Sequence, residues 1–178
     1  GIDIQLMVYM EAAMKLVAKM RPGKNVIPAG VFYYNISDPI VSATTESAEE
    51  IEDKIKGELR LKGMVNSDKD IAEKMDNTGG TSLNIPVSRK ADGGFDSRRS
   101  KVMNTEQFNM LGRFVDVRAV DTADRIAGGD IRRSPYKDGQ FSSCDRCPYG
   151  AVCGFSVDLP GCNYRKLKKF DDEVLWNN

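Results

Sequence analysis

The sequence of 178 residues predicts a mixed α/β fold, because segments with helical and extended patterns alternate along the chain. Residues 3–20 are rich in helix-forming side chains, whereas residues 26–36 are β-branched or aromatic almost throughout. Residues 104–127 repeat apolar side chains at helical spacing. Together these segments predict a mixed sheet that is flanked by helices.

The first predicted helix covers residues 3–20 and ends at Arg21-Pro22-Gly23, which is a strong stop signal. Its pattern starts without a cap or a preceding turn, so we expect the chain to begin inside a longer domain. The next segment, Val26–Ile36, has the length and composition of a strand that is buried on both faces of a sheet. Ser37-Asp38-Pro39 is expected to end this strand.

A capping box, Ser47-Ala-Glu-Glu50, predicts a helix from Ser47 to about Arg60. Residues 59–65 are short and mildly apolar, which is typical of an edge strand, and residues 68–75 predict a short helix. The glycine-rich stretch 77–96 is interpreted as a loop that contains a hairpin around residues 82–87.

The clearest helical pattern runs from Asn104 to Ala127 and stops at Gly128-Gly129. Its apolar side chains form one stripe: Phe108, Leu111, Val115, Ala119, Ala123 and Ile126. Residues 131–136 then lead into a cysteine-rich segment, and we divide the chain into residues 1–143 and residues 144–178 on this basis. The polar tail after Cys162 has few apolar side chains to bury: Leu167, Phe170, Leu175 and Trp176.

The composition restricts the chemistry that the chain can perform. The chain has no histidine, which excludes Ser-His-Asp and Cys-His catalysis and a histidine-ligated zinc site. The formal net charge is zero, so any DNA contact must depend on local basic runs such as residues 98–101, 132–133 and 165–169, which are otherwise solvated surface. The sequence shows no membrane span and no signal peptide, which favours reduced thiols over disulfides.

Three cysteines follow the spacing Cys144-x2-Cys147-x5-Cys153, and Cys162 comes eight residues later. Thiolates that are this close in sequence usually share a metal or form disulfides. The spacing leaves zinc and a [4Fe–4S] cluster equally open, with disulfides as a third interpretation and four unrelated buried cysteines as a fourth. Pro148 and the turn after it suit a backbone that folds around a compact inorganic core.

The spacing Gln5-x3-Tyr9 places an amide and a phenol on one face of the first helix. Both groups can hydrogen-bond a phosphate or orient a metal-bound water. By itself the pair is more often an ordinary surface and core-edge pair than a functional site.

Several motifs in order along the whole chain strongly resemble one family. They are Gln5-x3-Tyr9, residues 28–39 (PAGVFYYNISDP), residues 58–63 (ELRLKG), residues 144–155 (CDRCPYGAVCGF) and Tyr164-Arg165. The chain resembles the C-terminal end of the B subunit of AddAB-type ATP-dependent helicase–nucleases. The glutamine–tyrosine and cysteine motifs are shared with other RecB-like nucleases, whereas residues 28–39 and 58–63 point to the B subunit.

The resemblance implies a PD-(D/E)xK nuclease fold that cuts single-stranded DNA with Mg²⁺ during double-strand break repair in the cytoplasm. Gln5 and Tyr9 would support the active site. Cys144, Cys147 and Cys153 match three ligands of a [4Fe–4S] cluster whose fourth cysteine lies far upstream in the family. The implied partners are single- and double-stranded DNA and the A subunit of a helicase–nuclease heterodimer. Residues 1–143 would then be nuclease domain, and residues 144–178 would be the iron–sulfur loop and tail.

The chain departs from the family pattern in its catalytic carboxylates. The metal-binding Asp and the Glu/Asp-x-Lys motif precede the Gln-x3-Tyr helix in the family, and we find no such motif in a strand hairpin after Tyr9. We therefore expect these residues alone to be inactive; they also contain no phosphate-binding loop for ATP. Cys162 is a candidate fourth ligand that matches no ligand of the family, and zinc is a candidate metal for the isolated chain. The alternative function is a non-catalytic zinc-binding module that contacts DNA or a protein partner.

Overall fold

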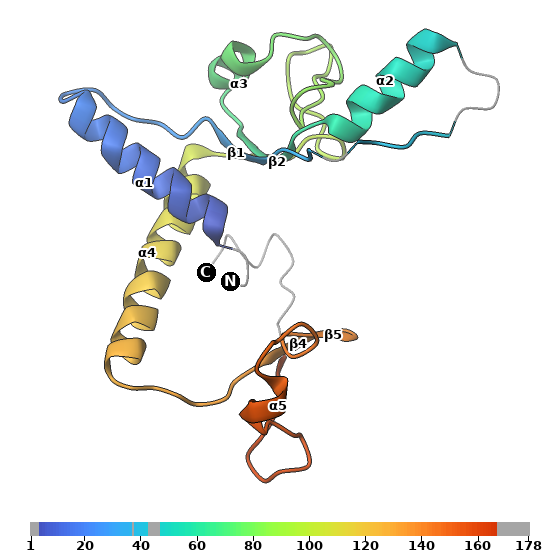
Figure 1. Ribbon diagram of the computed structural model, residues 1–178. Coiled ribbons are helices and arrows are strands. Elements are labelled where there is room, and N and C mark those ends of the chain that lie inside the picture. Colours follow the sequence, from blue (N-terminus) through green and yellow to red (C-terminus); the bar gives the residue numbers. More distant parts are fainter. Residues whose placement is uncertain (1–3, 37, 43–46, 167–178) are drawn as a thin grey trace. The chain divides into compact units, whose positions relative to one another are not determined.

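The computed structural model describes residues 4–36, 38–42 and 47–166, which form parts of two compact units, residues 1–119 and residues 120–178 (Figure 1). The predicted start of the first helix at residue 3 and the tail from residue 167 onward lie outside the described residues. The expected cysteine-rich segment falls wholly within the second unit. The expected boundary between residues 143 and 144 stays a prediction.

The first unit contains a mixed sheet of three strands within the described residues: β1 (Gly30–Tyr33), β2 (Lys62–Asn66) and β3 (Val102–Met103). Strand β2 lies in the centre, antiparallel to β1 and parallel to β3. The register pairs Phe32 with Gly63 and Val65 with Val102. The prediction of a mixed sheet in an α/β fold is therefore confirmed.

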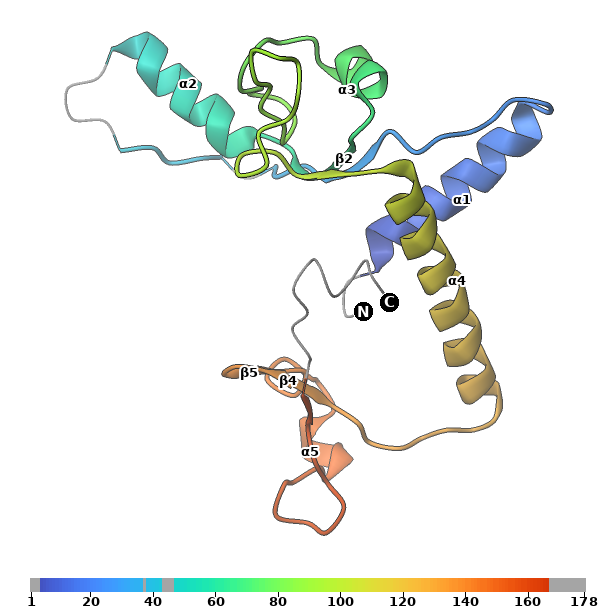
Figure 2. The ribbon, with the colours of Figure 1, turned by 180° about the vertical axis from the view of Figure 1, so that it is seen from behind.

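One face of this sheet carries the main apolar core. Helix α3 (Lys69–Met75) and the loop 77–96 lie on this side in both opposite views (Figures 1 and 2). Val65 on β2 is fully buried against three buried side chains from these segments: Ala72, Ile85 and Val87. The loop 77–96 therefore supplies core residues, although its glycines and polar residues predicted only a loop with a hairpin.

Helices α1 (Gln5–Met20) and α4 (Thr105–Ala127) lie on the other side of the same sheet (Figures 1 and 2). Gly112 of α4 is buried, and a side chain at this position would overlap the carboxyl group of Glu11 on α1. One turn further along each helix, Lys15 forms an ion pair with Asp116 at 2.9 Å. The absence of a side chain at Gly112 therefore leaves room for the Glu11 side chain at this crossing.

The two shorter helices of the first unit begin where the sequence predicts. Helix α2 (Ala48–Leu59) has a complete capping box, because the Ser47 hydroxyl accepts from the Glu50 amide and the Glu50 carboxylate accepts from the Ser47 amide. Helix α3 is capped by Asp68, whose carboxylate accepts from the amides of Asp70 and Ile71. The predicted helices at residues 47–60 and 68–75 are confirmed.

The structure corrects the predictions for both strands. Val26–Ile36 is not a strand buried on both faces: β1 has four residues, and the flanking Ile27 and Tyr34 are 44% and 63% exposed. Residues 59–65 do not form an edge strand, because β2 is paired on both sides. Apolar composition alone predicted burial, whereas burial depends on which segments pack from elsewhere in the chain.

The apolar stripe of α4 is buried over the first half of the helix and exposed over the second half. Phe108 and Val115 are 0% and 3% exposed, but Ile126 is 72% exposed in the described structure. The division between the two compact units falls inside this helix, after Ala119. The predicted bounds of the helix agree with the structure to within one residue, and the predicted apolar stripe contributes to the core only in its first half.

A buried carboxylate at the end of α3 organises the loop 77–96. Asp76 is 8% exposed and accepts hydrogen bonds from the Ser82 hydroxyl at 2.6 Å, the Thr78 amide at 2.8 Å and the Asn84 amide group at 3.1 Å. Burial opposes ionisation, but these hydrogen bonds outweigh it and hold the pKa of Asp76 well below its ordinary value. Arg89 closes the other side of the loop by donating to the backbone carbonyls of Asp76 and Thr78.

The second unit contains β4 (Tyr136–Asp138), β5 (Phe141–Ser142), the short helix α5 (Gly150–Cys153) and β6 (Arg165–Lys166). Strand β4 pairs antiparallel with β5 and parallel with β6. The cysteine-rich segment lies between β5 and β6, so this small mixed sheet holds both ends of the segment. Among the described residues, no helix is long and apolar enough to cross a membrane.

Candidate functional site

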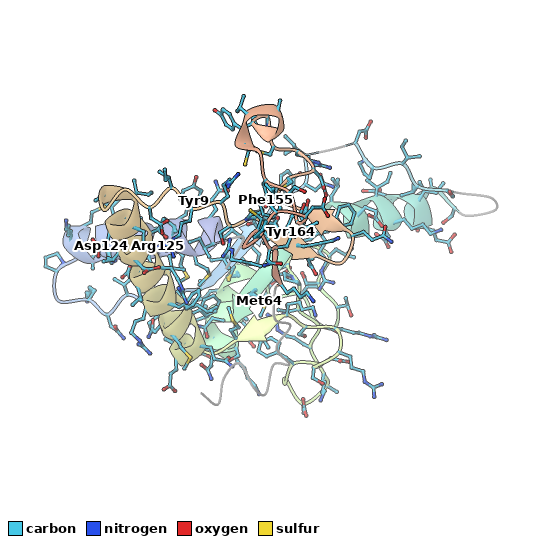
Figure 3. All side chains as sticks on the ribbon, turned by 90° about the horizontal axis from the view of Figure 1, so that it is seen from below. Tyr9, Met64, Asp124, Arg125, Phe155 and Tyr164 are labelled. Carbon is cyan, nitrogen blue, oxygen red and sulfur yellow. The ribbon has the colours of Figure 1, made fainter. Side chains whose placement is uncertain are left out.

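Gln5 and Tyr9 lie one turn apart on α1, and the Gln5 amide donates a hydrogen bond to the Tyr9 hydroxyl at 2.8 Å. The prediction that the two side chains project side by side is confirmed. Tyr9 is 60% exposed, and Figure 3 shows its position on the helix. Both polar groups are held in one orientation but remain accessible to a ligand, and their supporting role in catalysis stays a prediction.

Tyr9 also borders an apolar groove between α1 and the segment that leads into β1. The groove has a volume of about 490 Å³. Its lining combines side chains of the helix with residues of the extended segment: Leu6, Tyr9, Met10, Ala13, Met14, Val17 and residues 26–31. Tyr9 is therefore part of an otherwise apolar surface within the first unit.

The cysteine segment is a succession of tight turns. The Cys147 amide donates to the Cys144 carbonyl at 3.1 Å, and the Cys153 amide donates to the Tyr149 carbonyl at 2.8 Å. Gly154 ends α5 in the left-handed conformation, with φ of 61°. The thiols of Cys144, Cys147 and Cys153 are free, and Cys147 is exposed.

Two side chains outside the cysteine motif hold this segment in place. The Arg133 guanidinium donates from one nitrogen to the carbonyls of Cys153 and Gly154, at 2.9 Å and 3.0 Å. The Tyr164 ring packs edge-on against Phe155 with centroids 5.0 Å apart, and Figure 3 shows the two rings together. The hydrogen bond between the Tyr164 hydroxyl and the Cys144 thiol raises the pKa of Tyr164 above its ordinary value.

Sequence reasoning missed the roles of Arg133 and Tyr164. Arg133 was assigned to a basic surface run, and Tyr164 contributed to the family resemblance without a role of its own. Arg133 and its partner Cys153 are 20 residues apart in the sequence. Tyr164 contacts Phe155, which is nearer in the sequence. The position of Arg133 beside the cysteine segment was the available signal, because a buried or turning backbone needs donors for its carbonyl groups.

The donor set of the cysteine segment fits a thiolate-ligated metal in its chemistry. It offers three thiols within ten residues, and Cys162, which is half-buried, offers a fourth. Among the residues that the structure describes, however, no three Cys, Asp or Glu side chains are arranged to hold a metal ion. The choice between an iron–sulfur cluster and zinc therefore stays a prediction.

One formal Glu-x-Lys match occurs in the chain, at Glu52-Asp53-Lys54, and the structure places it on α2. Side chains two residues apart on a helix point about 200° apart around its axis, so Glu52 and Lys54 do not share a face. Glu52 instead forms an ion pair with Lys56 at 2.8 Å, and the two side chains are about half exposed or more. This match therefore has the geometry of a solvated helix surface rather than of a metal site in a strand.

The fold agrees with a comparison to protein families. Residues 2–154 match the model of the PD-(D/E)XK nuclease superfamily. The chain therefore belongs to the PD-(D/E)XK nuclease superfamily.

Several curated proteins that are similar to this chain carry one name, which describes each of them as the B subunit of an ATP-dependent helicase/deoxyribonuclease. The protein of Thermoanaerobacter sp. (strain X514) is 35% identical over 179 residues, which cover 99% of this chain and 15% of that protein. The proteins of Clostridium botulinum (strain Hall) and Lachnoclostridium phytofermentans are 36% and 34% identical, and each alignment covers 99% of this chain and 16% of that protein. The chain thus spans about 15% of the length of these relatives.

Proposed function

We propose that this chain is part of the nuclease domain of a helicase–nuclease B subunit that degrades single-stranded DNA during recombinational repair of double-strand breaks. The main support is the continuous similarity of 99% of the chain to proteins that are named as the B subunit of ATP-dependent helicase/deoxyribonucleases. In this proposal the residues belong to a polypeptide of the relatives' length. Its partners are DNA and an A subunit, and it acts in the cytoplasm.

Within this function Gln5 and Tyr9 have a supporting role beside the catalytic metal. Their mutual hydrogen bond at 2.8 Å fixes the tyrosine hydroxyl, and the exposure of Tyr9 leaves it accessible to a phosphate or to a metal-bound water. Both groups are neutral, so they orient a partner without changing the charge of the site. Positioning of this kind accelerates a reaction because the reacting groups are held at the right distance.

The catalytic Mg²⁺ is held by carboxylates outside these 178 residues. Phosphodiester cleavage needs carboxylates that hold Mg²⁺ and polarise the attacking water. The formal match at residues 52–54 lies on a solvated helix and does not supply that site. The 178 residues alone therefore bind DNA or a partner but do not cleave DNA.

Cys144, Cys147 and Cys153 supply three ligands of a [4Fe–4S] cluster, and the fourth comes from a distant part of the same polypeptide. The support is their spacing within a segment of tight turns whose ends are held by one small sheet. A cluster ligated in this way stabilises a fold because it cross-links distant segments. Anaerobically purified protein with sulfide-to-iron charge-transfer absorption supports the cluster, whereas colourless protein with stoichiometric zinc supports the zinc-binding module.

The nuclease proposal is tested by substitutions at Tyr9 in the full-length polypeptide that carries these residues. We expect Tyr9→Ala and Gln5→Ala to slow Mg²⁺-dependent degradation of labelled single-stranded DNA by about tenfold or more, because a positioned group is lost. Leu16→Ala is the matched control, since Leu16 is 58% exposed on the same helix and lies outside the motifs. Degradation at the wild-type rate by both motif variants contradicts the role assigned to α1.

A further inference from the structure

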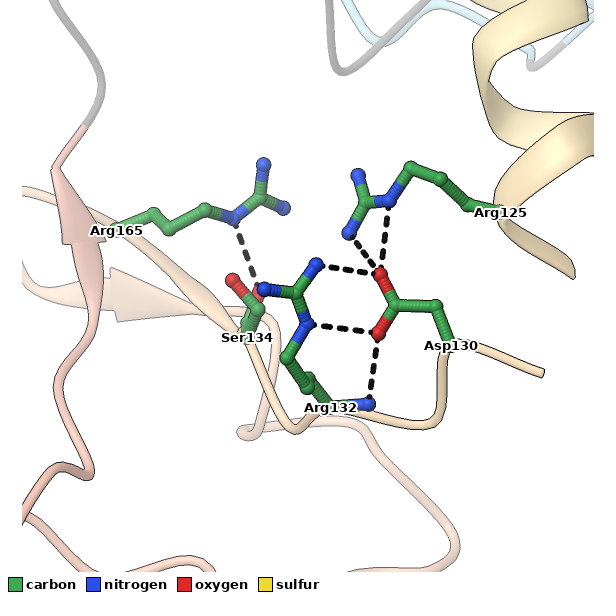
Figure 4. A network of polar contacts seen from close by, with 5 residues as sticks. All are labelled: Arg125, Asp130, Arg132, Ser134 and Arg165. Carbon is green, nitrogen blue, oxygen red and sulfur yellow. Dashed lines mark hydrogen bonds and ion pairs between the residues drawn. The ribbon is translucent and has the colours of Figure 1, made fainter. Parts of the chain in front are cut away.

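Two arginines bind one carboxylate in the second unit, and a third donates to the backbone a few residues further along the chain. Asp130, just after α4, accepts from Arg125 Nε at 2.9 Å and from Arg132 Nε and its terminal nitrogen at 2.9 Å and 2.7 Å. The Arg132 backbone amide donates to the same carboxylate at 3.1 Å. The guanidinium of Arg165, from β6, points toward this group, and its Nε donates to the Ser134 carbonyl at 3.0 Å (Figure 4).

The carboxylate holds Arg125 and Arg132 in place but does not neutralise the three arginines. Three guanidinium groups carry three positive charges, and Asp130 supplies one negative charge, so two positive charges remain. The hydrogen bonds from Arg132 and then from Arg125 hold the pKa of Asp130 well below its ordinary value, so the carboxylate stays ionised at neutral pH. The arrangement is therefore permanently cationic.

The unused donors of this cluster face solvent. Asp130 is 15% exposed, whereas the side chains of Arg125 and Arg132 are 53% and 78% exposed. Within the described residues, the two terminal nitrogens of Arg165 have no hydrogen-bond partner. A guanidinium has five N–H donors, and the bonds to Asp130 and Ser134 use a minority of those that the three groups offer.

We propose that Arg125, Arg132 and Arg165 form a contact site for the phosphodiester backbone of DNA. Asp130 orients the first two, and the Ser134 carbonyl orients Arg165. Guanidinium groups bind phosphate oxygens through paired N–H donors, and a fixed orientation reduces the entropy that is lost on binding. The site is expected to bind DNA of any sequence, since contacts with phosphate groups do not distinguish one base from another. This inference rests on the proposed function, because it assigns to the second unit a contact with the strand that the nuclease degrades.

The test measures the binding of the 178-residue chain to a fluorescein-labelled 20-nucleotide thymidine strand, by anisotropy over a range of salt concentrations. Arg165→Ala is expected to weaken binding about three- to tenfold and to reduce the salt slope by about 0.7, which is the loss of one phosphate contact on a single strand. Arg132→Gln is expected to reduce the slope by a similar amount. Arg165→Lys keeps the charge, so it is expected to keep the slope and to lose part of the affinity.

The matched control is Arg113→Ala, because Arg113 is an exposed arginine on α4 that lies outside the cluster and outside the cysteine segment. We expect it to bind as the wild type does. If Arg165→Ala and Arg132→Gln, with wild-type circular dichroism, keep the wild-type affinity and slope, the cluster is not a DNA contact, and the nuclease proposal stands unaffected. Failure of the wild-type chain to bind the strand also overturns the inference that the cluster contacts DNA. Displacement of the strand by micromolar ATP identifies a nucleotide site instead and overturns the inference.

Discussion

Replacing Asp76 with alanine removes the acceptor on which the loop 77–96 depends. Asp76 is buried, and its carboxylate accepts from the Ser82 hydroxyl, the Thr78 amide and the Asn84 side chain at 2.6–3.1 Å. Ser82 is fully buried, so its hydroxyl loses a strong acceptor in a place where water does not replace it. The loop also carries Ile85 and Val87 into the core, which couples this network to the packing of the sheet.

The expected loss of stability follows from the number and burial of these bonds. A hydrogen bond to a charged group contributes about 1.5–3 kcal/mol, and we assign that range to the buried Ser82 bond. The other two bonds are partly exposed and contribute about 1 kcal/mol each, so Asp76→Ala is expected to destabilise the fold by about 3–5 kcal/mol. Asp76→Asn keeps one acceptor oxygen and is expected to cost about 1–3 kcal/mol.

Urea unfolding followed by far-ultraviolet circular dichroism measures these differences. The matched control is Asp92→Ala in the same loop, because Asp92 is exposed and accepts from the Gly94 amide alone among the described residues; its expected cost is about 0.5 kcal/mol. A loss for Asp76→Ala within about 0.5 kcal/mol of this control, in an assay with that resolution, refutes the assignment of the network as the organiser of the loop.

The same residue predicts a dependence of stability on pH. The folded-state pKa of Asp76 lies below the unfolded value of about 3.9, so its contribution is present above about pH 4 and is lost as the pH falls toward the folded pKa. Between pH 5 and pH 2.5 the free energy of unfolding is therefore expected to fall further for the wild type than for Asp76→Asn. Equal acid sensitivity of the two proteins is the contradicting result.

Two further pairs of substitutions test the sheet and the cysteine segment. Gly63→Ala is expected to cost about 2–4 kcal/mol in urea unfolding, because the added methyl group overlaps the Val31 backbone across the strand pair, whereas Gly57→Ala, with open space on α2, is expected to stabilise by about 0.5–1 kcal/mol. In anaerobically purified protein, Cys147→Ser is expected to lower the melting temperature by about 5 °C or more relative to Cys162→Ser, because Cys147 belongs to the motif of ligands. Equal melting temperatures for the two cysteine variants count against that assignment.

The local signals of the sequence were reliable where neighbouring residues determine structure. The capping box at Ser47 and Glu50 forms with both of its hydrogen bonds, and Asp68 caps the next helix. Gln5 and Tyr9 meet because residues four apart on a helix are neighbours. In each case the interacting residues are separated by four positions or fewer, so the chain specifies the contact without its fold.

Only the tertiary structure determined which distant segments of the chain pair or contact one another. Residues 59–65 became the centre of the sheet because β1 and β3 pair with β2 on either side. Arg133 reaches Cys153 across 20 positions, and Arg165 reaches the Ser134 carbonyl across 31 (Figure 4). Composition and periodicity report which residues prefer to be buried or charged, but the partner of each depends on chain reversals that no local pattern encodes. The family and the candidate residues were therefore visible in the sequence, whereas the organising contacts around them came from the fold.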